Sequence, residues 1–206
     1  MKTILNEYMK INRVYNDDRE YELGCLMLEL NIPFWNKLLS VFKEHDIYDD
    51  GTNKYGLEEE THITILYGFI DNEKLYKNIL KDVITIGRNI KNYYKKHNIN
   101  SHDLNNLCVD IKNISVFENP EYNVIKIDVE SDWITKLNKY FKKKYENENK
   151  HPIYNPHITI GYLKKDVDYN IYIKKIKNIL ISQNFRKICG DGFYYNGTHN
   201  YTYFLK

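Results

Sequence analysis

The chain has 206 residues, of which 42% are hydrophobic, and this is enough for one domain with a substantial core. Thirty lysines and arginines nearly balance 28 aspartates and glutamates, so the formal charge of +2 excludes a globally basic nucleic-acid-binding surface. No apolar run approaches the roughly 18–20 residues that span a bilayer, and the N-terminus has no apolar core of signal-peptide length. We therefore expect a cytoplasmic protein with no membrane association.

Secondary structure in the first half of the chain follows from its hydrophobic periodicity. Residues 1–21 are expected to form an N-terminal extension, and the apolar run 22–30 has the length of a strand. The segment 32–45 places apolar residues at helical spacing. A turn-rich loop then leads into a strand that begins at His62, and helical periodicity returns over much of 71–97.

The second half opens on two strands, 107–117 and 123–130, separated by a turn that contains Asn119 and Pro120. This arrangement predicts a β-hairpin. Ser131 or Asp132 is placed to cap a helix with one apolar face. The remaining predicted elements are a strand from His157, a helix near 167–182, and two aromatic strands joined at Asn196-Gly197.

The three cysteines, Cys25, Cys108 and Cys189, are odd in number and widely separated in the sequence. This pattern favours reduced thiols over a disulfide framework or a zinc cluster. We assign them no chemistry.

Four letters, HITI, occur twice, in "THITILYGF" (61–69) and in "PHITIGYLK" (156–164). Each half of the chain runs strand, helix, HITI strand, helix, strand, and the second half opens on an extra strand. No Ser/Gly-rich linker divides the halves. The sequence therefore predicts a single α+β domain over 1–206, made of two pseudo-symmetric lobes at approximately 22–106 and 107–206.

Strict alternation along a strand predicts which side chains share a face in each copy. In the first copy the expected polar face comprises His62, Thr64 and Leu66, and the opposite face comprises Ile63, Ile65 and Tyr67. In the second copy the corresponding sets are His157, Thr159 and Gly161, and Ile158, Ile160 and Tyr162. The isoleucines are expected to anchor each strand, which leaves histidine and threonine available for chemistry.

One such strand is compatible with an ordinary amphipathic strand, but two copies on related lobes bring two imidazoles and two hydroxyls around one point. One neutral imidazole can take a proton from water or a ribose 2'-hydroxyl, and the opposite imidazolium can protonate the leaving oxygen. Threonine hydroxyls can bind the non-bridging oxygens. The pattern predicts phosphodiester cleavage by His62, Thr64, His157 and Thr159.

A metal centre is the alternative interpretation of the histidines. It requires three or more converging ligands, whereas each HIT motif supplies one, and the other histidines show no HExxH pattern. We expect no metal and no other cofactor. The sequence also has no Gly-x-Ser-x-Gly, P-loop or GxGxxG motif, which removes the usual serine-hydrolase, NTPase and dinucleotide-binding classes.

Paired His-x-Thr motifs on β-strands about a hundred residues apart resemble the two-histidine (2H) phosphoesterase superfamily, which includes 2'-5' RNA ligase-like proteins and RNA cyclic phosphodiesterases. The stretches "YGLEEETHITILYGF", "ISVFENPEYNVIKIDVES" and "YNPHITIGYLK" look like 2H proteins of phages and other viruses, some of which degrade nucleotide second messengers of host defence. The likeness covers roughly 22–69 and 107–206.

The resemblance implies a bilobal fold with antiparallel sheets lining a central groove and helices outside. It also implies metal-independent attack on a 2'-5', 3'-5' or 2',3'-cyclic phosphodiester by the two intact motifs, and immune evasion in the host cytoplasm for a viral member. The resemblance does not say which histidine is the acid and which is the base.

Residues outside the motifs are candidates for substrate binding. Tyr154, Phe193 and Tyr194 are placed to stack on bases, and the alternative for each is packing within a strand. Lys126 is placed to meet a phosphate, and the alternative is a solvated sheet face. Tyr21, at the entrance to the first strand, completes the set.

The favoured function is hydrolysis of a small nucleotide: a cyclic oligonucleotide second messenger, a 2'-5' oligoadenylate or a 2',3'-cyclic phosphate. Duplex nucleic acid is not expected because the chain has no basic stripe. A non-catalytic nucleotide-binding sponge or RNA-binding module, and RNA end-processing or ligation, remain alternatives, and the oligomeric state is open.

Overall fold

The computed structural model describes residues 23–52, 54–70, most of 75–86, 107–197 and 201–204. These residues form seven strands: β1 (Gly24–Leu30), β2 (His62–Phe69), β3 (Cys108–Glu118), β4 (Tyr122–Glu130), β5 (His157–Lys164), β6 (Lys187–Asn196) and β7 (Tyr201–Phe204). The helices with assigned bounds are α2 (Trp35–Leu39), the 3-10 turn η1 (Glu44–Asp46), α4 (Asp132–Lys144) and α5 (Tyr169–Ser182). No described helix is long and apolar enough to cross a membrane.

The predicted elements agree with the structure in type, and they differ most in the first half. The predicted helix 32–45 is shorter, because only α2 and η1 are helical there. The described residues between 75 and 86 are helical, and the rest of 71–97 lies outside the described residues, as do the N-terminal extension and Tyr21. Ser131 caps α4 by accepting a hydrogen bond from the backbone N–H of Ile134.

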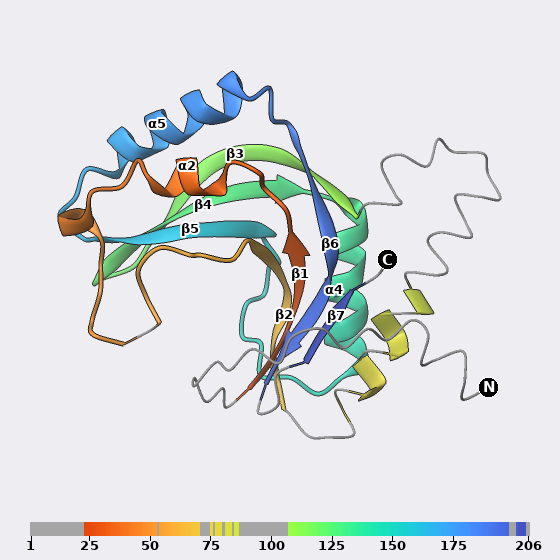
Figure 1. Ribbon diagram of the computed structural model, residues 1–206. Coiled ribbons are helices and arrows are strands. Elements are labelled where there is room, and N and C mark those ends of the chain that lie inside the picture. Colours follow the sequence, from red (N-terminus) through yellow and green to blue (C-terminus); the bar gives the residue numbers. More distant parts are fainter. Residues whose placement is uncertain are drawn as a thin grey trace.

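All strand pairs are antiparallel and form one sheet in the order β2-β1-β6-β3-β4-β5, with β7 beside β6 (Figure 1). Strand β6 joins the two parts of the sheet: Gly190–Asn196 pairs with β1, whereas Lys187–Cys189 pairs with β3. The two HITI strands, β2 and β5, lie at opposite ends of this order. They nevertheless approach each other, with Cα atoms within 8 Å.

Helices cover one face of the sheet, and this face forms the core. Helix α4 packs on β2, and α5 packs on β3 and β4 (Figure 1). Residues around α2 contact the region of α5, because Phe34 meets Phe185 edge to face at 4.6 Å and Phe42 stacks on Tyr172 at 4.9 Å. We call the opposite face, which carries the histidines of both motifs, the inner face.

The division of the sheet does not coincide with the predicted sequence boundary between 106 and 107. Strands β6 and β7 extend the part of the sheet that contains β1 and β2, and α4 also covers that part. Conversely, the segment that contains α2 packs against α5. Each part of the molecule is therefore built from both halves of the chain.

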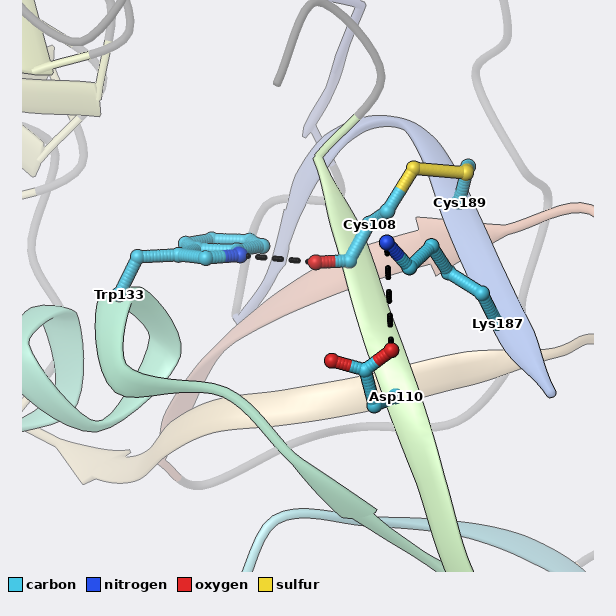
Figure 2. The surroundings of a disulfide bond; sticks show 5 residues. All are labelled: Cys108, Asp110, Trp133, Lys187 and Cys189. Carbon is cyan, nitrogen blue, oxygen red and sulfur yellow. Dashed lines mark hydrogen bonds and ion pairs between the residues drawn. A yellow bond between two sulfur atoms is a disulfide. The ribbon is translucent and has the colours of Figure 1, made fainter. Parts of the chain in front are cut away.

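The expectation of three reduced thiols is corrected by a disulfide between Cys108 and Cys189, which face each other on β3 and β6 with a Cα–Cα distance of 3.9 Å. Figure 2 shows this bond at the junction of the two parts of the sheet. Trp133 of α4 donates its indole N–H to the Cys108 carbonyl at 3.0 Å, and Lys187 lies 4.0 Å from Asp110. Facing positions on neighbouring antiparallel strands bring two cysteines together whatever their separation in sequence.

Candidate active site

The first HIT motif begins at the start of β2. His62 and Thr64 are half-buried on the inner face, whereas Ile63 and Ile65 are completely buried in the core. The isoleucines thus fix the strand and its register, as predicted. The ring of Tyr194, on β6, lies edge-on to the His62 ring with centroids 6.1 Å apart.

The second HIT motif begins at the start of β5 and has the same pattern of burial, with His157 and Thr159 half-buried and both isoleucines buried. The His157 Nδ1 lies 2.8 Å from the backbone carbonyl oxygen of Asn155. Because a carbonyl oxygen only accepts, Nδ1 must carry the proton in the neutral imidazole. Nε2 is then the nitrogen that can exchange a proton with a substrate.

Both motifs contain a β-bulge at the same place. Strand β1 pairs Met27 with Thr64 and Leu26 with Leu66, so Ile65 is the extra residue. Strand β4 pairs Lys126 with Thr159 and Ile125 with Gly161, so Ile160 is the extra residue. The repeat therefore includes a local backbone irregularity as well as four letters of sequence.

Because of the bulges, the strict alternation of side chains predicted for both strands is wrong for the residues beyond each bulge. Leu66 lies in the core with 1% exposure rather than beside His62, and Tyr67 is 48% exposed. In the second copy Gly161 pairs with Ile125 of the core, and Tyr162 pairs with Val124. One extra residue in a strand reverses the facing of every residue beyond it.

Different partners accommodate the two bulges. The carbonyl of Ile65 accepts a hydrogen bond from the buried side-chain amide of Asn138, on α4, at 2.7 Å. The carbonyl of Ile160 accepts one from the backbone N–H of Glu58 at 3.0 Å. The Glu58 segment runs along the edge of β5, where Leu57 bridges Gly161, and then continues into β2. This path explains how the chain delivers His62 close to the second motif.

Lys126 lies on the inner face beside the second motif, because it pairs with Thr159. It is 5% exposed, so the alternative of a solvated sheet face is wrong for this residue. Its ammonium donates to the Ser115 hydroxyl at 2.7 Å and to the carboxylate of Asp128, and it lies 4.1 Å from the centroid of the Phe117 ring. The cation is therefore held within a network of side chains on β3 and β4.

The surroundings of His157 lower the pKa of its imidazole below the usual 6.5. Burial is the main cause; the hydrogen bond with Asn155 opposes it, the Lys126 ammonium lowers the pKa further, and the Asp128 carboxylate raises it. Phe117 contributes to the burial because its ring meets the His157 ring edge to face at 4.9 Å. His157 is consequently neutral near pH 7, the protonation state that a general base requires.

The predicted stacking residues occupy three different positions. Tyr154 is half-buried, and its hydroxyl donates to the Thr64 carbonyl at 2.8 Å, so it joins the two motifs. Burial raises the pKa of Tyr154 and of Tyr194, which keeps both hydroxyls neutral. Phe193 is corrected: it is 3% exposed on the core face and packs edge to face with Trp133, since neighbours in a strand point to opposite faces.

Sequence reasoning did not identify several residues of the site. Asp128, Ser115 and Phe117 surround Lys126 and His157. The sequence feature that could have identified them is spacing: Ser115 and Phe117, like Lys126 and Asp128, are two residues apart on a predicted strand and therefore share a face. Cys25 is buried beside the first motif, where its side chain is hydrogen-bonded to that of Thr64 and burial raises the pKa of the thiol to about 12. The sequence does not show that Cys25 lies beside the first motif, because this contact depends on how β1 pairs with β2.

Among the residues that the structure describes, no group of three histidine, cysteine, aspartate or glutamate side chains is arranged to hold a metal ion. The inner face of the described chain presents the imidazoles and hydroxyls of both motifs, a carboxylate residue paired with each histidine, and the buried Lys126 ammonium.

Comparison of the fold with known proteins gives its class. No family model matches the chain, and no curated protein matches its sequence. By structure, however, the chain has a mixed α+β fold with a large antiparallel sheet and few helices, and this fold matches that of solved structures of Usb1, which confirms the predicted fold class.

Two solved structures with a similar fold are those of Usb1 from Kluyveromyces marxianus, one by itself and one with uridine monophosphate. Each matches with a TM-score of 0.53 and 11% sequence identity, and covers 90% of this chain and 99% of the Usb1 chain. At this identity the likeness defines the fold, and the chemistry must be argued from the residues of this chain.

Proposed function

We propose that this protein is a metal-independent phosphodiesterase that cleaves a nucleotide phosphodiester by two-histidine acid/base catalysis. The observation that carries the proposal is the duplicated site. Two His-x-Thr motifs, each with a carboxylate residue paired opposite the histidine and each with the same bulge, begin two strands that approach each other. A phosphodiester needs one proton removed and one donated, and two equivalent strands provide one histidine for each transfer.

The proposed reaction transfers one proton at each histidine. The oxygen of a water or ribose hydroxyl attacks phosphorus while its proton passes to a neutral imidazole. The bond from phosphorus to the leaving oxygen breaks, and the imidazolium of the other motif donates a proton to that oxygen. Thr64 and Thr159 donate hydrogen bonds to the non-bridging oxygens, where negative charge is concentrated. Exchange of one proton with solvent at each imidazole restores the starting state.

The proposed substrate is a small nucleotide or a short oligonucleotide. Support comes from the near-neutral charge of the chain, which disfavours long duplexes, and from the Usb1 structure that contains a nucleoside monophosphate. Cyclic oligonucleotide messengers, 2'-5' oligoadenylates and 2',3'-cyclic phosphates are the classes to compare, and a counter-defence role in the cytoplasm of a host is part of the same proposal.

The proposal is tested by incubating the protein in EDTA with a panel of 3'-5', 2'-5', cyclic and 2',3'-cyclic nucleotides, followed by mass spectrometry of the products. We expect cleavage in EDTA, and a loss of at least ~100-fold in His62→Ala and in His157→Ala. His151→Ala is the matched control, since this exposed histidine lies outside both motifs, and it should retain wild-type activity.

Other outcomes of the same assay contradict the proposal. Cleavage that EDTA abolishes would require a metal mechanism. Ligands that raise the melting temperature but are recovered uncut would favour the nucleotide sponge. Joining of 5'-hydroxyl and 2',3'-cyclic ends, without hydrolysis, would favour ligation.

A further inference from the structure

The two motifs differ in one charged residue at equivalent positions of the neighbouring strand. On β1, Glu29 pairs with His62 and Met27 pairs with Thr64. On β4, Asp128 pairs with His157 and Lys126 pairs with Thr159. A carboxylate residue therefore lies opposite each histidine, but only the second copy has a cation opposite the threonine.

Lys126 is held so that its charge acts on its immediate surroundings. The side chain is 5% exposed, and its ammonium is bound by Ser115 and Asp128 and covered by the Phe117 ring. Asp128 pairs directly with His157 and acts on its imidazole, and the Lys126–Asp128 ion pair neutralises this carboxylate. The Asp128 side chain is 25% exposed, so the ion pair is partly buried, and such a pair is screened by salt much less than an exposed one.

The groups that face the two histidines differ in net charge. His157 pairs with Asp128 of β4, meets the uncharged ring of Phe117 from β3, and is also acted on by the Lys126 ammonium. On the other side, Tyr194 lies edge-on to His62, and Glu29, Glu58 and Glu60 all contribute negative potential at Tyr194. Carboxylates favour an imidazolium, whereas a neutralised carboxylate does not.

We infer that Lys126 is a positioning residue that neutralises Asp128, keeps His157 uncharged as the general base, and leaves His62 to act as the general acid. The inference rests on the proposed function for these catalytic roles, but its electrostatic content concerns the protonation of two side chains and can be measured without substrate. In the reaction, the proton of the attacking hydroxyl passes to Nε2 of His157, and the leaving oxygen takes its proton from His62.

The first test is an NMR titration of the histidine ring protons in the full chain, with signals assigned from His62→Ala and His157→Ala. Lys126→Met removes the cation, so the Asp128 carboxylate should stabilise the imidazolium and raise the pH at which His157 titrates. Asp128→Asn removes the carboxylate and should lower it. Lys112→Met is the matched control, because it removes an exposed lysine of the neighbouring strand β3 and should leave the titration of His157 nearly unchanged.

Opposite shifts distinguish electrostatics from loosened packing. Loosening would expose His157 to water in either variant and would move its titration upward in both. The inference would be overturned if His157 titrated at the same pH in all variants, or if Lys126→Met and Asp128→Asn shifted this pH in the same direction. If Lys126→Met fails to fold, the test depends on Asp128→Asn, since only the electrostatic role predicts that this variant lowers the pH at which His157 titrates.

The second test is the pH profile of kcat/KM. A general base must be deprotonated, so its titration sets the acidic limb of the profile. Lys126→Met should lose about tenfold in activity at pH 6 and less than about twofold at pH 8, with Lys112→Met near wild type at both. Expected NMR shifts without cleavage of any substrate would refute the proposed function and leave the protonation assignment standing. A profile unchanged in Lys126→Met would overturn His157 as the base.

Discussion

The hydroxyl of Tyr154 donates to the backbone carbonyl of Thr64 at 2.8 Å, and this bond ties the residue just before the second motif to the strand of the first. Ninety residues of chain separate the two partners. The bond therefore constrains the relative placement of the two histidines.

Tyr154→Phe removes this hydrogen bond and keeps the ring. We expect a loss of about 1 kcal/mol in the free energy of unfolding, measured in urea, and a decrease in kcat/KM without a change in its pH limbs. Tyr67→Phe, on the exposed part of β2, is the control and should be neutral in both assays. A Tyr154→Phe protein with unchanged stability and activity would show that the bond does not hold the motifs together.

The bulge in the first motif depends on Asn138, which satisfies the carbonyl of Ile65 from helix α4. Asn138→Leu fills the same space but leaves a buried carbonyl without its donor, so we expect the free energy of unfolding to fall by about 1–3 kcal/mol. Asn149→Ala removes a weaker, exposed bond of the same type to the Tyr67 carbonyl and should cost less than about 1 kcal/mol. The reverse ranking in urea unfolding would contradict the role assigned to Asn138.

Phe193 and Tyr194 are neighbours in β6 that face opposite sides of the sheet, and their substitutions should separate stability from activity. Phe193→Ala should lower the free energy of unfolding by about 3–5 kcal/mol, because it empties a site in the core. Tyr194→Ala, beside His62, should mainly reduce kcat/KM. Calorimetry measures the stability of the two variants, and kinetics measure their activity. Comparable losses of stability in both variants would contradict the placement of the two side chains on opposite faces of the sheet.

The disulfide joins β3 and β6 across a sequence separation of 81 residues, at the three-residue pairing that connects the two parts of the sheet. Cys108→Ser should lower the free energy of unfolding by about 2–4 kcal/mol, because the open chain gains conformational freedom when unfolded. Reduced wild-type protein should match the variant, and the variant should not respond to a reductant. Equal stability of oxidised and reduced wild type would exclude a stabilising bond.

Asp82 links the helical residues near 75–86 to α4 by accepting hydrogen bonds from Tyr140, Tyr145 and Lys144. Burial opposes its ionisation, but these bonds hold the pKa of the carboxyl below its usual 3.8. A lowered pKa contributes stability above the usual value that is lost as the pH falls through the folded value. Asp82→Asn should therefore cost about 1–3 kcal/mol at pH 7, and its difference from wild type should shrink below about pH 4.

The sequence by itself determined the type of most of the described elements, the fold class and the two motifs. Alternation and turn residues located β3, β4 and β5 within a residue or two, because these signals act between neighbours in the chain. The repeated isoleucines also identified the buried anchors of both HIT strands, since a strand that is polar on one side must bury the other.

Only the tertiary structure decided the bulges, the disulfide and the pairing of Lys126 with Thr159. Each depends on the register between strands that are distant in sequence, and register is set by packing across the whole sheet. The core position of Leu66 and the buried charge of Lys126 follow from it. The two motifs are alike in their letters, and the charge of the neighbouring strand is what makes them different.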